Sequence, residues 1–126
     1  MRSALKLGKL FVVVIGIVAG MSSLPVRADE AFVAFWTKFV TALNNDDVET
    51  VRSLVEFPVT YDGQELGKDS FPTIYDGWFN ADARACLATT TPAEDGVDYY
   101  VAYCELIYVF ANTDKGWRFE SVSAND

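Results

Sequence analysis

Histidine is absent from the 126 residues of this sequence. Without it neither a Ser-His-Asp triad nor a Cys-His pair can form, and the commonest metal ligand is missing. The sequence also lacks a P-loop, a G-x-G-x-x-G segment, an H-E-x-x-H segment and a nucleophile elbow. The acidic segment AEDGVD at 93–98 does not have the spacing of a calcium-binding loop. We therefore expect no metal site and no cofactor.

Basic residues are scarce, with ten Lys and Arg against eighteen Asp and Glu. Four of the ten lie in residues 1–28, so residues 29–126 keep six basic and eighteen acidic residues, a net charge of −12. Such a surface repels phosphate backbones and anionic lipid, which excludes nucleic acid as a partner. It would attract a basic protein or a small cationic ligand.

Long hydrophobic runs are also missing, apart from the uncharged run Leu10–Gly20. Three basic residues precede this run, and the small residues Val26 and Ala28 follow it. This layout predicts a secretory signal peptide, residues 1–28, that is cleaved between Ala28 and Asp29. The alternative is a membrane anchor, which needs roughly 20 apolar residues. We expect residues 29–126 to be periplasmic or secreted, with no membrane attachment after cleavage.

The sequence has only two cysteines, Cys86 and Cys104. They are too far apart to form a C-x-x-C redox pair. In an oxidising compartment we predict a structural disulfide that stabilises the fold by roughly 3 kcal/mol. The alternative is two unrelated buried thiols.

Apolar residues at three- and four-residue steps predict a first helix over residues 29–43. Asp46 and Glu49 then form a capping-box pattern in front of a second helix, which we expect Pro58 to end. A metal cluster of acidic residues is the alternative at this position. A third, aromatic helix is predicted over residues 71–79.

Asp62-Gly63 between alternating residues predicts a short hairpin. Residues 99–111 predict a strand, and residues 117–122 predict a strand that runs back beside it. The segment 81–90 fits either a helical turn or a strand. We therefore predict one α+β domain over residues 29–126, with two to three N-terminal helices packed on a curved antiparallel sheet that ends in a long C-terminal β-hairpin.

Four segments carry a resemblance to a known family: FVAFWTKFVTALNNDD, LVEFPV, FPTIYDGWF and KGWRF. In element order and apolar spacing the chain resembles the nuclear transport factor two-like superfamily, also compared with cystatins, and most of all its small secreted bacterial members of unassigned function. The resemblance implies three helices on the concave face of the sheet and a pocket at its wide end. It also implies a convex face that pairs with a second copy.

Both faces of the strand predicted at 98–110 are apolar. A bridge from Cys86, which follows the third helix, would turn Cys104 and the even-numbered residues toward the helices. The odd-numbered residues would then form an outer interaction face for a homodimer or a basic protein partner. Its predicted members are Tyr99, Val101, Tyr103, Glu105, Ile107 and Val109. The alternative is the reverse assignment of the two faces.

Three functions are compatible with these observations. The first is a non-enzymatic periplasmic binding module with a ligand pocket lined by Tyr61, Tyr75, Trp78 and Tyr108, although these rings could instead fill the core. The second is an acidic inhibitor or immunity-type protein that captures a basic enzyme. The third is an isomerase-like enzyme, in which Asp76 or Glu105 would act as base opposite one of the pocket tyrosines. No residue matches a catalytic motif of the family, so no catalytic residue is assigned.

Overall fold

The computed structural model describes residues 24–125. The chain divides into two units, residues 1–33 and residues 34–126. Of the first unit the structure describes residues 24–33, which begin helix α2 (Leu24–Asn44). Residues 1–23 of the predicted signal peptide lie outside the described residues, and the predicted cleavage site between Ala28 and Asp29 falls within α2. No helix within residues 24–125 is long and apolar enough to span a bilayer.

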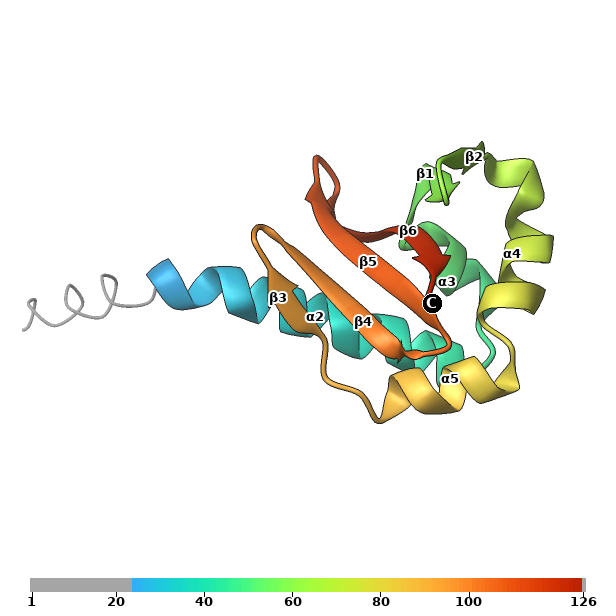
Figure 1. Cartoon of the computed structure of the whole chain (residues 1–126). Coiled ribbons are helices and arrows are strands. Elements are labelled where there is room, and N and C mark those ends of the chain that lie inside the picture. Colours follow the sequence, from blue (N-terminus) through green and yellow to red (C-terminus); the bar gives the residue numbers. More distant parts are fainter. Residues whose placement is uncertain (1–23, 126) are drawn as a thin grey trace, which may run out of the picture. The chain divides into compact units, whose positions relative to one another are not determined.

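The second unit contains a six-stranded sheet in the order β2-β1-β6-β5-β4-β3 (Figure 1). Its strands are β1 (Val55–Tyr61), β2 (Gln64–Leu66), β3 (Ala93–Asp95), β4 (Asp98–Cys104), β5 (Leu106–Thr113) and β6 (Gly116–Ala124). The fold is α+β, as predicted, and β5 and β6 form the predicted C-terminal hairpin. One pairing differs from the prediction of an antiparallel sheet, because β1 lies parallel to β6. The two strands are far apart in sequence, so no tight turn forces them to be antiparallel.

The three predicted helices are present, with shifted ends. After α2 come α3 (Val48–Ser53), the short 3-10 helix η2 (Lys68–Ser70), α4 (Phe71–Trp78) and α5 (Ala81–Ala88). The N-cap of α3 is Asp47, whose side chain accepts a hydrogen bond from the backbone N–H of Thr50, and not Asp46 as predicted. The chain leaves the helix at Leu54 to enter β1, so Pro58 lies inside that strand. The ambiguous segment 81–90 is largely helical.

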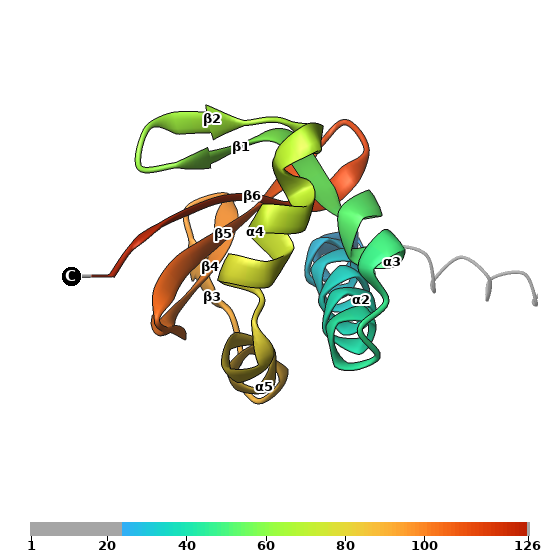
Figure 2. The ribbon, with the colours of Figure 1, turned by 90° about the vertical axis from the view of Figure 1, so that its right-hand side faces the viewer.

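Four phenylalanines form the centre of the core in residues 34–126. Phe39, Phe79, Phe110 and Phe119 are all fully buried. The ring of Phe39 in α2 lies 5.5 Å from that of Phe110 in β5 and 5.7 Å from that of Phe79. In Figure 2 α4 passes in front of β5 and β6. Phe79 follows α4, and its ring centroid lies 5.2 Å from that of Phe119 in β6. One face of the sheet is therefore closed by aromatic packing, which provides much of the hydrophobic stabilisation of a small domain.

The stretch at 98–110 is not one strand. Glu105, with φ of 79°, turns the chain between β4 and β5, so that Cys104 pairs with Leu106. The register also shifts between Val101 and Cys104, and such an irregularity reverses the faces of the residues before it. The sequence signals a strand through this point because it has no glycine, proline or asparagine there.

The predicted outer face is therefore partly wrong. Val101 is 2% exposed and pairs with the buried Tyr108. Tyr99 pairs with the buried Phe110 and shares its face. Glu105 occupies the turn, and Tyr103 is 87% exposed. Ile107 and Val109 are half-buried on the face of β5 opposite to that of Tyr108 and Phe110. Self-association through the remaining residues stays a prediction.

Candidate functional site

The predicted ligand pocket is only half assembled. Tyr61 in β1 and Trp78 in α4 lie with ring centroids 5.6 Å apart. Both line a cleft of about 270 Å³, which we term the aromatic cleft. Its remaining lining residues are Leu66, Ser70, Thr73 and Ile74.

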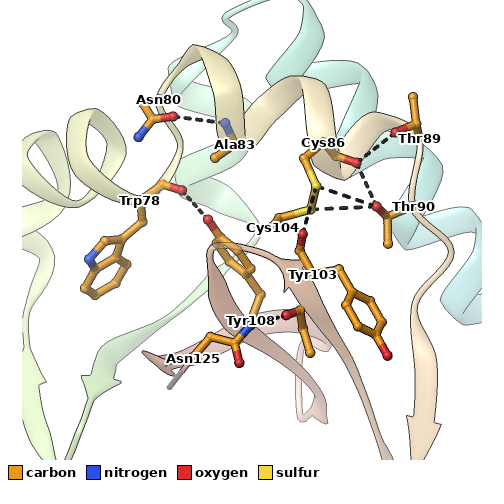
Figure 3. Close-up of a disulfide and its surroundings, with 11 residues drawn as sticks. Trp78, Asn80, Ala83, Cys86, Thr89, Thr90, Tyr103, Cys104, Tyr108 and Asn125 are labelled. Carbon is orange, nitrogen blue, oxygen red and sulfur yellow. Dashed lines mark hydrogen bonds between the residues drawn. A yellow bond between two sulfur atoms is a disulfide. The ribbon is translucent and has the colours of Figure 1, made fainter.

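The other two tyrosines of the predicted pocket belong to the core. The Tyr75 hydroxyl donates a hydrogen bond to Oδ1 of Asp46 at 2.7 Å, and the Tyr108 hydroxyl donates to the carbonyl of Trp78 at 2.6 Å (Figure 3). Burial, together with the smaller effect of the hydrogen bond to Asp46, raises the pKa of Tyr75 to about 12. Burial also raises the pKa of Tyr108, with a smaller contribution from the charge of Glu105. These hydroxyls connect elements of the fold and do not line the aromatic cleft.

The predicted acid–base pairs are not arranged as an isomerase needs. Asp76 and Glu105 are both exposed, whereas a general base of this kind works in a desolvated pocket. Glu105 is close enough to affect the pKa of Tyr108, but the Tyr108 hydroxyl is already occupied by the Trp78 carbonyl. Within residues 24–125 no group of three or more Cys, Asp or Glu side chains could hold a metal ion.

The predicted disulfide is present between Cys86 in α5 and Cys104 in β4 (Figure 3). Thr90 follows α5, and its hydroxyl donates to the Cys86 carbonyl at 2.8 Å. Its Oγ1 also lies 3.8 Å from the sulfur of Cys86 and 3.7 Å from that of Cys104. The disulfide thus cross-links α5 to the end of β4.

A larger cleft of about 450 Å³ is lined by cationic residues that the sequence analysis assigned to no site. Four cationic side chains line it, and we term it the basic cleft. Its lining residues are Glu49, Arg52, Ser53, Val55, Phe57, Lys68, Lys115 and Arg118. The cations come from α3, η2, the β5–β6 turn and β6, whereas the apolar pair Val55 and Phe57 comes from β1.

Local interactions hold the elements of the basic cleft in place. The backbone N–H of Phe119 donates to the carbonyl of Leu54 at 2.9 Å, which ties the end of α3 to β6. In the β5–β6 turn the hydroxyl of Thr113 donates to the Gly116 carbonyl at 2.8 Å and accepts from the Lys115 backbone N–H at 3.1 Å. These hydrogen bonds fix the backbone at the end of α3 and in the β5–β6 turn, two of the elements that carry the cations.

The lining of the basic cleft contains more cations than carboxylates. In the part of the chain that the structure describes, Arg52, Lys68, Lys115 and Arg118 form no ion pair. Arg118 donates from one guanidinium nitrogen to the Trp117 carbonyl at 2.7 Å, and its other N–H groups stay available. Glu49 is the single acidic residue in the lining. The lining thus combines an excess of cationic donors with two apolar side chains.

Comparison with known proteins adds no relative. No protein-family model matches the chain, and no curated protein or solved structure matches it either. The resemblance to the nuclear transport factor two-like superfamily stays a prediction that rests on its four sequence segments.

Proposed function

We propose that this protein is an extracytoplasmic, non-enzymatic binding module that takes a small anion in the basic cleft. One observation carries the proposal. Of the six basic residues in positions 29–126, four line this one cleft, although eighteen acidic residues surround them in the sequence. A random scatter of so few cations would not place most of them around one hollow.

The chemistry of the lining suits an anion. Arg52 and Arg118 offer planar guanidinium groups for bidentate bonds, and Lys68 and Lys115 offer mobile ammonium groups. A charge-assisted hydrogen bond contributes about 1.5–3 kcal/mol, less in a site open to water. Two or three such bonds, after the costs of association, give a dissociation constant on the order of 0.1–1 mM for inorganic phosphate.

Titration of the full chain with inorganic phosphate, followed by NMR chemical shifts at low salt, tests the proposal. We expect Arg52→Gln and Lys115→Gln each to weaken binding about five- to tenfold, because each removes one charged donor. Lys38→Gln is the matched control, since Lys38 is exposed on α2 and does not line the cleft. Equal losses in the control variant, or no shifts at the cleft in the unaltered protein, would remove the proposal.

The extracytoplasmic location is part of the same proposal. It is supported by the signal-peptide pattern in residues 1–28 and by the disulfide, which forms and persists in oxidising compartments. Expression of the full chain in a bacterial host tests it. We expect a periplasmic product that begins at Asp29 by intact mass. A product that keeps residues 1–28 would contradict cleavage.

Capture of a basic protein is a second candidate function. The observation that favours it is the charge outside the basic cleft, where only Lys38 and Arg84 remain as basic residues of positions 29–126. Such an acidic surface attracts a basic partner electrostatically, and salt reduces the range of this attraction. Binding of a basic protein should therefore weaken steeply between low and physiological salt, and binding that salt leaves unchanged would exclude this mode.

A further inference from the structure

We infer that the ligand of the basic cleft is an organic dianion, in which the charged group is joined to an aromatic or short aliphatic body. The inference rests on the proposed function and narrows its ligand class. It follows from the size of the cleft, from the apolar side chains in its lining and from the balance of charge there.

The cleft is large enough to hold an organic ligand. The cleft has a volume of about 450 Å³, which lies within the range of roughly 300–1,000 Å³ that is typical of sites for organic ligands. A water molecule occupies about 30 Å³ in the liquid, so an oxyanion of five heavy atoms would leave most of this space to solvent. A ligand that fills the cleft must have a body as well as an anionic group.

The lining also contains apolar side chains. They are Val55 and Phe57, both from β1. The Phe57 ring is half-buried and packs edge-on against Phe71, with centroids 6.0 Å apart. Phe57 thus has a packing partner in the core and also lines the cleft, which suits contact with an apolar or aromatic body.

The lining also has an excess of positive charge, with four cations and one carboxylate, Glu49. Lys115 also lines a neighbouring cleft together with Glu56 and Asp114, so the excess of three charges holds for this lining alone. A monoanion would neutralise a third of this excess, whereas a dianion bridges cations from separate elements, such as Arg52 of α3 and Lys115 of the β5–β6 turn. The Ser53 hydroxyl donates to the Thr50 carbonyl at 2.7 Å, and the Glu49 carboxylate repels an anionic group close to it. The body of the ligand, and not its charged end, therefore belongs near Glu49.

Phenyl phosphate and inorganic phosphate are the probes that test this inference, each titrated into the full chain at low salt by calorimetry and NMR. We expect phenyl phosphate to bind about tenfold more tightly, since its ring buries apolar surface on Val55 and Phe57. Phe57→Leu should reduce this preference to about threefold, because the smaller side chain buries less apolar surface against the phenyl ring. Trp78→Phe in the aromatic cleft is the control and should change neither affinity.

The possible outcomes separate the inference from the proposed function. Equal affinities for the two probes would overturn the inference and leave anion binding intact. Binding of neither probe would overturn both. Phenyl phosphate binding that survives Phe57→Leu and is lost in Trp78→Phe would place the ring in the aromatic cleft and overturn the inference. If Phe57→Leu melts at a lower temperature, nuclear Overhauser effects between the phenyl protons and Phe57 in the unaltered protein decide, and their absence counts against it.

Discussion

Reduction of the disulfide should destabilise the fold by about 3 kcal/mol. The bridge closes a loop between Cys86 and Cys104, which are 18 positions apart. A cross-link over such a loop removes chain entropy from the unfolded state that corresponds to roughly 3 kcal/mol at 25 °C. In the folded state Cys104 is buried at 2% exposure, so its sulfur keeps most of its packing contacts after reduction. Because domains of this size are stable by only about 5–15 kcal/mol, the melting temperature should fall by roughly 12–24 °C.

Urea unfolding followed by tryptophan fluorescence measures this loss. The oxidised protein is compared with the reduced protein and with a Cys86→Ala/Cys104→Ala variant. The reduced protein keeps both sulfur atoms, so it isolates the cross-link, and the double variant adds the loss of their packing. We expect the reduced protein to lose about 3 kcal/mol and the variant somewhat more. A loss below about 1 kcal/mol on reduction would show that α5 and β4 are held together without the bridge, and it would refute the chain-entropy argument.

Three further predictions concern stability. Burial and two neighbouring carboxylates raise the pKa of Glu120, so its ionised form opposes folding. Glu120→Gln should therefore raise the melting temperature at pH 7 but not at pH 4. An equal gain at both pH values contradicts this prediction. Burial raises the pKa of Tyr75 to about 12 and also raises that of Tyr108, so the unfolded chain loses these protons first. The free energy of unfolding should therefore fall as pH rises above about 10, by up to about 1.4 kcal/mol per pH unit for each tyrosine, and a flat urea-unfolding profile from pH 9 to 11.5 would count against both assignments. Asp47→Ala should cost about 1 kcal/mol through loss of the cap bond to Thr50, whereas an unchanged midpoint would mean that this bond does not stabilise α3.

Much of the fold could be predicted because its signals are local. Asp62-Gly63 produces the β1–β2 turn with φ of 47° and 87°, which is the geometry that this pair favours. Phe35 and Phe39 are four residues apart and share the buried face of α2 within residues 34–44. The turn at Glu105 escaped prediction, since a positive φ at a glutamate is uncommon and depends on the pairing of β4 with β5.

The candidate site was harder to predict because it is assembled by long-range topology. Tyr61 and Trp78 were predicted to share a pocket, and they do line one cleft. The cations of the basic cleft stand at positions 52, 68, 115 and 118, with no spacing that a motif could describe. These cations lie close together because β1 pairs in parallel with β6, which brings the first strand of the chain beside the β5–β6 hairpin. A net charge summed over the chain hides such a local excess.

This local excess also determines which anions the proposed site would accept. Residues 29–126 carry a net charge of −12, yet the basic cleft has four cations and one carboxylate. At 0.1 M salt the Debye length is about 10 Å, so an anion inside the cleft responds mainly to the cleft, and an extended polyanion also meets the acidic surface beyond it. Nucleic acid would gain a few contacts and suffer repulsion along the rest of its length. Salt weakens the repulsion as well as the attraction, so discrimination between a small dianion and a polyanion should be greatest at low salt.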